Sequence, residues 1–278
     1  MSNWNRNTLW RQGCLLKDET INALNLLSPE HLDDTVVIVA THDCDLAQSP
    51  EKEPEIEVIV GHRIQQIDGN YTHAKSSRTL DLVFEGYSTF FAEFNITNKR
   101  IIQKVILSAF EPNIDFKLSL PQKSTFQVWL ASRYRRSAFP DEFEHRLKNS
   151  GLAKKIAKIV KQYGEMITAI FFDVDEGNSV EFSTSNFVYS LSIILVYETE
   201  LDPNEAERVA NEAKIAIELA FRTKLFDEES RNWEQIELQY IDVVSDEALS
   251  YRQSRLLKKW RLDHISLATT PQQPISND

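Results

Sequence analysis

The sequence has little cysteine, little glycine and no long apolar segment. It contains only two cysteines, Cys14 and Cys44, and seven glycines among 278 residues. Small secreted domains are usually rich in disulfides, so the sequence does not belong to that class. The first residues lack the apolar core of a signal peptide, and the longest apolar run, Ile193–Tyr197, is too short to cross a bilayer. We therefore expect a soluble cytoplasmic protein with reduced thiols and no membrane partner.

Positive charge is also scarce. The chain carries 31 Lys and Arg residues against 42 Asp and Glu, which gives a net charge of -11. Nucleic-acid-binding faces depend on clustered Lys and Arg, so the composition does not favour a nucleic-acid partner, although a local basic patch stays compatible with it. Hydrophobic residues make up 42% of the chain, which is enough for a folded core. A protein partner or a homo-oligomer stays open, and no motif identifies a cofactor.

The periodicity of the apolar residues predicts an α+β protein with three folded parts. Residues 1–120 contain short strands separated by tight turns, which predicts a β-rich, barrel-like domain. Residues 121–165 have helical periodicity and are expected to form a helical connector. Residues 166–267 follow the order β-β-α-β-α, which favours an α/β sandwich similar to half of a ferredoxin-like fold. We expect residues 268–278 to form a disordered tail.

Several elements carry strong local signals. The dipeptide Asp68-Gly69 is typical of a tight turn and predicts a hairpin. Asp202 precedes Pro203, and this pair predicts the N-cap and first residue of a long helix. Residues 246–260 are predicted to form a final helix that closes the last domain.

The first candidate site follows a predicted buried strand over residues 36–40. Polar, titratable side chains at the end of a core strand often belong to a binding or catalytic site. His42 and Cys44 share one face of an extended chain, and the two aspartates share the other. We take Asp43 and Asp45 as candidate catalytic residues. His42 and Cys44 are candidate ligand-binding residues.

One chemistry compatible with this stretch is zinc binding. His42 and Cys44 are of the residue types that bind zinc. The sequence contains no CxxC, HxxxH or HExxH motif that would support such a site. The remaining ligands would have to come from Cys14, His62 or His73.

Two further chemistries involve a thiol or carboxylates. Cys44 could act as a nucleophile, but the two flanking aspartates oppose formation of a thiolate. Asp43 or Asp45 could bind Mg²⁺ together with Glu55 or Glu57 for phosphodiester cleavage. The lysine expected after Glu57 in such nucleases is missing. We favour a structural interpretation over all three chemistries, with the thiol buried and the aspartates accepting hydrogen bonds in a turn.

The second candidate site is rich in arginine. Arg133 and Arg136 lie three residues apart on a predicted helix and would share one face. Two neighbouring guanidinium groups suit a phosphate or a carboxylate. Arg78 could join them as a third ligand-binding residue. The alternative, which an acidic chain favours, is that the arginines pair internally with acids such as Asp141 and Glu142.

Three blocks of the sequence resemble a recurring group of bacterial proteins to which no activity is assigned. The blocks are Trp10-Arg11-Gln12-Gly13, the strand and turn VVIVATHDCDLA, and the segment WLASRYRRSAFPDEF. The resemblance covers parts of residues 4–145 and implies a bacterial source. It also implies an accessory-genome setting, in some cases near antiphage-defence or mobile-element genes. Because the blocks include both candidate sites, the resemblance favours one shared site.

The leading hypothesis is a binding or sensing protein. The turn at residues 42–45 and the two helical arginines would form a polar pocket for an anionic ligand. A second hypothesis is a metal-dependent hydrolase, most simply a nuclease of a bacterial conflict system. A third is a structural subunit that binds a partner protein.

Overall fold

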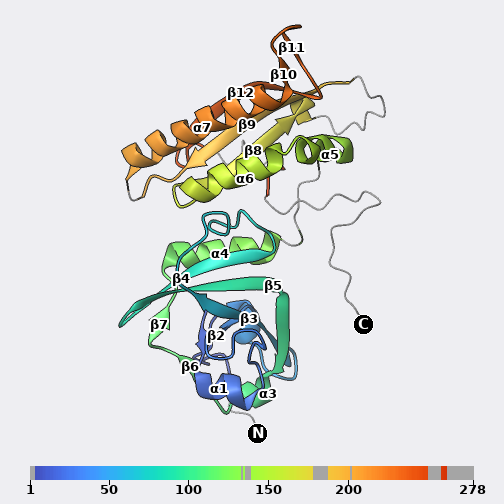
Figure 1. The fold of residues 1–278 in the computed structure, drawn as a ribbon. Coiled ribbons are helices and arrows are strands. Elements are labelled where there is room, and N and C mark those ends of the chain that lie inside the picture. The colour runs from blue at the N-terminus through green and yellow to red at the C-terminus, as the bar shows by residue number, and fades with distance from the viewer. Residues whose placement is uncertain are drawn as a thin grey trace. The chain divides into compact units, whose positions relative to one another are not determined.

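The fold is mixed α+β, which confirms the predicted class (Figure 1). A computed structural model describes residues 4–132, 134, 139–177, 187–200, 202–249 and 258–261. The chain forms two compact units. Unit 1 comprises Met1–Ile67 and Ser76–Tyr134, and unit 2 comprises Asp68–Lys75 and Arg135–Asp278. Within the described residues, no helix is long and apolar enough to span a membrane.

Unit 1 is built on a seven-stranded antiparallel sheet that is nearly closed into a barrel, with strand order β6-β1-β2-β3-β5-β4-β7. Its strands are β1 (Leu15–Leu16), β2 (Thr35–Val39), β3 (Glu55–Ile64), β4 (Thr79–Gly86), β5 (Thr89–Gln103), β6 (Pro112–Asn113) and β7 (Phe116–Lys117). Its helices are α1 (Asp18–Ala23), α2 (Asp43–Leu46), α3 (Lys104–Leu107) and α4 (Leu120–Ser132).

β2 and β3 form the centre of the unit 1 core. Val37, Ile38 and Val39 have no exposed surface, so β2 is buried on both faces. β3 lies between β2 and β5, and its residues Ile56 and Val58 are also fully buried. β-branched side chains of this kind pack well on a pleated surface. Because β2 is buried, the residues that follow Val39 begin at the edge of the core in a defined position.

The loop after β3 differs from the hairpin expected there. The chain does turn at Asp68, whose carbonyl oxygen accepts the Tyr71 N–H at 2.8 Å. However, β5 lies between β3 and β4 in the sheet, so the strands on either side of this turn are not partners. The hairpin prediction is wrong because Asp68–Lys75 packs into unit 2 instead. A turn signal specifies a local bend and not the strands that pair.

Unit 2 contains a four-stranded sheet with strand order β12-β9-β8-β13 and a two-stranded ribbon. The sheet strands are β8 (Ile167–Val174), β9 (Tyr189–Tyr197), β12 (Ile236–Ser245) and β13 (Lys258–Lys259), and the ribbon strands are β10 (Phe226–Asp227) and β11 (Asn232–Trp233). The helices are α5 (Asp141–Asn149), α6 (Leu152–Tyr163), η1 (Asp175–Gly177) and α7 (Pro203–Leu225). The helices expected as a connector are thus divided between the units, with α4 in unit 1 and α5 and α6 in unit 2.

α5, α6 and α7 pack against the sheet of unit 2 (Figure 1). The predicted apolar stripe of α6 is confirmed, since Leu152, Ile156 and Val160 have no exposed surface. The predicted N-cap of α7 is also confirmed. Asp202 Oδ1 accepts a hydrogen bond from the Glu205 N–H at 3.1 Å, which satisfies a donor that the helix itself leaves unpaired.

β13, the last strand among the described residues, pairs with β8 as an extended segment. β13 runs antiparallel to β8, so the helix expected over residues 246–260 is wrong at its C-terminal end. Trp260 is 5% exposed and stacks on Phe172 with ring centroids 5.0 Å apart. Burial of this ring in the sheet core accounts for the extended conformation. Residues 250–257 and the tail expected over residues 268–278 lie outside the described residues.

Candidate functional site

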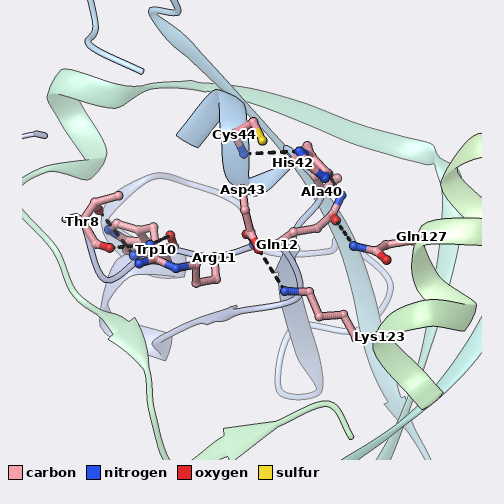
Figure 2. A network of polar contacts seen from close by, with 10 residues as sticks. All are labelled: Thr8, Trp10, Arg11, Gln12, Ala40, His42, Asp43, Cys44, Lys123 and Gln127. Atoms are coloured by element: carbon pink, nitrogen blue, oxygen red, sulfur yellow. Dashed lines mark hydrogen bonds and ion pairs between the residues drawn. The ribbon is translucent and has the colours of Figure 1, made fainter. Parts of the chain in front are cut away.

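The turn after β2 lies at the edge of the unit 1 core. The chain leaves β2 and enters α2 through Thr41, whose hydroxyl accepts the Glu57 N–H at 2.7 Å. His42 is the N-cap of this one-turn helix, and its Nδ1 accepts the N–H of Cys44 at 3.2 Å. The imidazole therefore bonds to the backbone of Cys44. Asp43 is the first residue of α2 and points toward α4 (Figure 2).

Asp43 is the centre of a polar cluster that joins three segments of unit 1 (Figure 2). Its Oδ1 accepts the backbone N–H of Gln12 at 2.7 Å, and its Oδ2 lies 3.1 Å from Nζ of Lys123. The Gln12 side chain donates to the Ala40 carbonyl at 2.7 Å and accepts from Gln127 Nε2 at 2.9 Å. We call Gln12, Asp43, Lys123 and Gln127 the Asp43 network. It holds the start of α2 between the N-terminal loop and α4.

The surroundings of Asp43 keep its carboxylate charged. Partial burial alone would raise the pKa of Asp43, but hydrogen bonds from the Gln12 N–H and from Lys123 outweigh it. The pKa of Asp43 is therefore lower than the ordinary value of an aspartate. The side chains of Asp43 and Lys123 remain 39% and 30% exposed, so both reach solvent.

Arg11 lies beside the network and is held in place by the backbone. Its Nη1 donates to the carbonyl oxygens of Thr8 at 2.5 Å and Trp10 at 2.7 Å. The residue is exposed, and within the described residues no carboxylate lies at ion-pair distance from it. Its charge still reaches Asp43 and contributes to the lowered pKa of that carboxyl. Arg11 is thus an ordered cation that has no acidic partner in the described part of the chain.

Lys104 holds the other end of α2 from inside the core. It has no exposed surface, and its Nζ donates to the carbonyls of Asp45 at 2.5 Å and Gln48 at 3.0 Å. Its Nζ also lies 5.8 Å from the centre of the Trp4 ring. The last carbonyls of a helix have no partner within the helix, and a cation there is favourable. Lys104 therefore positions α2 without belonging to the exposed cluster.

The predicted residues of the turn divide into two groups. Asp43 enters the network, whereas the side chains of His42, Cys44 and Asp45 are exposed and form none of its hydrogen bonds or ion pairs. The interpretation of Cys44 as a buried thiol is therefore wrong. Acceptance of the Gln12 N–H by Asp43 agrees with the structural role expected for that aspartate.

The predicted arginine cluster cannot be assembled from the described residues. Arg133 and Arg136 lie outside them. Arg78 is described, and its N–H donates to the Ser76 hydroxyl at 3.1 Å while its carbonyl accepts the Ile96 N–H at 2.8 Å. These contacts involve the backbone of Arg78 and do not place its guanidinium in the Asp43 network.

The described carboxylates do not converge on a cation position. Glu57 pairs with Lys99 at 2.7 Å, and Glu55 accepts a hydrogen bond from Gln103 at 3.0 Å. Both pairs lie along the β3–β5 ladder. In the described part of the chain, no group of three or more His, Cys, Asp or Glu residues could hold a metal ion. The hydrolase hypothesis therefore has no assembled site among these residues.

The other expected zinc ligands have separate surroundings. His62 stacks on His31 with ring centroids 3.7 Å apart, and burial lowers the pKa of His62. His73 belongs to unit 2, where its Nε2 lies 2.9 Å from the Glu165 carbonyl oxygen. Cys14 is half-buried, and burial raises the pKa of its thiol. A raised pKa opposes both metal binding and nucleophilic attack by Cys14.

Sequence reasoning did not find three members of the network. Lys123 and Gln127 are ordinary polar residues without a local motif, and Gln12 belongs only to the Trp10-to-Gly13 block. Lys123 and Gln127 are four residues apart, so they share one face of α4. The signal that could have found Gln12 and Arg11 was the Trp10-to-Gly13 block, which carried the resemblance described above.

Comparisons of the chain with protein-family models, with curated proteins and with solved structures gave no significant match. The comparisons therefore add neither a family nor a related fold. The functional argument starts from the geometry of the Asp43 network and Arg11.

Proposed function

We propose that unit 1 is a binding or sensing module that holds a small anionic ligand at Arg11 and the Asp43 network. One observation carries the proposal. Two cations, Arg11 and Lys123, reach solvent beside a single carboxylate, Asp43. This local excess of positive charge occurs in a chain with a net charge of -11. The charges of Arg11 and Lys123 would attract an anion from solvent.

The two cations are already ordered. Two carbonyl oxygens hold the guanidinium of Arg11, and Asp43 holds the ammonium of Lys123. Ordered side chains lose less conformational entropy when a ligand binds. A guanidinium also presents further donors in a planar fork that suits a carboxylate or a phosphate. The arrangement therefore favours recognition of an oxyanion.

The same geometry favours binding over catalysis. A general base needs a pKa near the working pH, whereas the pKa of Asp43 is below its ordinary value. Both carboxylate oxygens of Asp43 already accept hydrogen bonds. Asp43 therefore supports the proposal as a residue that orients Lys123 and the N-terminal loop.

Calorimetric titration of the full chain with inorganic phosphate and with acetate tests the proposal. Each anion is expected to bind the wild type, and Arg11→Gln or Lys123→Gln to weaken binding at least tenfold, since a charge-assisted hydrogen bond contributes about 1.5–3 kcal/mol. Lys99→Gln is the matched control, because Lys99 pairs with Glu57 on the sheet. Failure of both anions to bind, or equal binding by wild type and both site variants, would overturn the proposal.

Arg133 and Arg136 remain in the proposal as further ligand-binding residues. Their glutamine variants enter the same titration, and a loss of affinity would extend the site to the segment after α4. A role in antiphage defence also remains a proposal, which rests on the resemblance of three sequence blocks. It predicts that a strain carrying the wild-type chain and its native neighbouring genes resists phage, and that Arg11→Gln removes the resistance.

A further inference from the structure

The outer face of α7 carries an apolar pair. Ile215 and Leu219 are 63% and 65% exposed, although α7 packs on the sheet of unit 2 (Figure 1). They lie four residues apart and therefore share one face of the helix. That face is opposite to the buried one, where Ala213 and Ile217 have no exposed surface. Contiguous exposed apolar surface marks an interaction site more often than isolated residues do.

Charged residues continue this face toward both ends of α7. Arg208 and Glu212 precede the apolar pair, and Arg222 follows it. The spacings alternate between four and three residues, which is the period of a seam between two packed helices. Arg208 pairs with Glu212, and Nε of Arg222 lies 2.9 Å from Oε1 of Glu228. We call this seam the α7 stripe, and its members are Arg208, Glu212, Ile215, Leu219 and Arg222.

We infer that the α7 stripe binds the same stripe of a second copy of the chain, with the two helices antiparallel. This inference is independent of the proposed function, which concerns unit 1. In a twofold-symmetric contact, residue i meets residue j and j meets i. Ile215 therefore packs on Leu219 of the second copy, and Glu212 meets Arg222 of the second copy. Both apolar pairs leave water, and both charged layers join opposite charges.

The charges select the antiparallel arrangement over a parallel one. A parallel pair in register would place Glu212 against Glu212 and Arg222 against Arg222, and such like-charge contacts are unfavourable. The antiparallel pair instead extends each existing ion pair into a group of alternating charge, because Glu212 is already bonded to Arg208 and Arg222 to Glu228. A second copy supplies this complementary order by symmetry, so the second copy is the occupant that the stripe fits.

The expected dimer is weak. Its contact uses one helix face per copy, which is small beside a standard interface of about 1,600 Å². Glu218 flanks the apolar pair and would approach Glu218 of the second copy, although Lys214, at 3.9 Å within the chain, offsets part of this charge. The net charge of -11 per chain also opposes association. We therefore expect a dissociation constant of about 10–100 µM.

Sedimentation equilibrium of the full chain over about 5–500 µM tests the inference. The wild type is expected to pass from monomer to dimer over this range. Ile215→Glu puts a carboxylate against Leu219 of the second copy and should weaken association at least tenfold. Leu32→Glu is the matched control, since Leu32 is 57% exposed and belongs to unit 1. A wild type that stays monomeric, or that Ile215→Glu leaves equally dimeric, would overturn the inference.

A mixture of two charge variants tests the antiparallel order. Glu212→Arg alone sets arginines against each other in both layers, and Arg222→Glu alone sets glutamates, so each variant should associate at least tenfold more weakly than the wild type. Mixed in equal amounts, the two form a heterodimer in which both layers again join opposite charges. Association should then return to within about threefold of the wild type. Misfolding of either variant would not be repaired by mixing, and a mixture as weak as its components would overturn the antiparallel contact.

Discussion

Gly69 and Gly164 are in direct backbone contact in unit 2. A Cβ added to Gly164 would lie 2.2 Å from the carbonyl oxygen of Gly69, and a Cβ added to Gly69 would lie 2.6 Å from that of Lys161. These distances are far below any normal contact. The contact sets the segment Asp68–Lys75 against the C-terminal end of α6. Unit 2 therefore includes Asp68–Lys75, a segment that lies in the sequence between the two segments of unit 1.

Gly164→Ala is expected to destabilise unit 2 by about 2–3 kcal/mol, because backbone atoms must move to admit the methyl group. Gly164 has φ -69°, which any residue adopts, so the effect is steric. Gly151→Ala is the control: its Cβ meets nothing within 4 Å, and its φ of +76° gives a strain of about 1 kcal/mol. Hydrogen exchange of the β8 amides in urea, which reports the opening of unit 2, measures both. Equal losses would contradict the close contact.

Lys75 secures the same segment from inside unit 2. It is 2% exposed, and its Nζ donates to the Thr72 hydroxyl at 2.9 Å, to the Ile167 carbonyl at 2.7 Å and to the Gly164 carbonyl. Lys75→Met keeps the apolar stem and removes three hydrogen bonds. An unsatisfied buried acceptor costs about 1–3 kcal/mol, so we expect a loss of roughly 3 kcal/mol or more.

Lys158→Met is the matched control for Lys75→Met, since Lys158 is exposed on α6. Its effect on the free energy of unfolding should stay within about 0.5 kcal/mol. The comparison uses hydrogen exchange of β8 amides, which reports unit 2 directly. Similar exchange rates in the two variants would show that the contacts of Lys75 do not stabilise the unit.

Local signals predicted α6 and α7 of unit 2 correctly, whereas the helix predicted over residues 246–260 was wrong at its C-terminal end. The cap at Asp202 and the apolar stripe of α6 depend on neighbours within four residues, so the sequence alone contains them. The buried lysines could not be predicted in this way. A lysine normally indicates a surface position, yet Lys75 and Lys104 are 2% and 0% exposed. Their acceptors are carbonyls brought together only by the tertiary fold.

In the candidate site, too, the sequence predicted the local feature but not the contacts that the tertiary fold makes. The exit of β2 was predicted because a run of β-branched residues ends in polar ones, and Asp43 does lie in a network there. The partners of Asp43 come from α4 and the N-terminal loop, at sequence separations of 80 and 31 residues. No pattern within one segment specifies such partners. Reasoning from residue type therefore selected Asp43 as a candidate but did not select its ion-pair partner, Lys123.

Two titratable groups of unit 2, His73 and Glu144, should have opposite effects on its stability between pH 4.5 and 6.5. Burial, together with the charge of Lys75, lowers the pKa of His73 to about 4. Burial and the charge of Asp141 raise the pKa of Glu144 to about 7. The unfolded chain protonates His73 near pH 6.5, so its contribution is lost as the pH falls from 6.5 to 4. The contribution of Glu144 is lost as the pH rises from 4.5 to 7.

The two effects oppose each other between pH 4.5 and 6.5, and single variants separate them. In Glu144→Gln, acidification from pH 6.5 to 4 should lower the free energy of unfolding by up to about 3 kcal/mol relative to the same change in the double variant Glu144→Gln/His73→Gln. In His73→Gln, acidification from pH 7 to 4.5 should instead raise stability relative to wild type. Urea titrations at four pH values measure this. Parallel profiles for the two variants would contradict the assignment.

Lys104 should control the order of α2 although it contacts no ligand. Its ammonium satisfies the carbonyls of Asp45 and Gln48 from within the core. In Lys104→Met these carbonyls lose their hydrogen-bond donor. Because α2 has only one turn, its own backbone hydrogen bonds stabilise it weakly. We expect hydrogen exchange of the Leu46 and Ala47 amides to accelerate at least tenfold, and acetate to bind more weakly because Asp43 is no longer fixed.

Lys99→Met provides the comparison for this prediction, since Lys99 makes only an exposed pair with Glu57 and should alter neither quantity. A positioning role requires that both quantities change together in Lys104→Met. If exchange accelerated while acetate affinity stayed constant, the anion would depend on Arg11 and Lys123 alone, and the order of α2 would not matter to it. Unchanged exchange would mean that the hydrogen bonds of Lys104 do not hold α2.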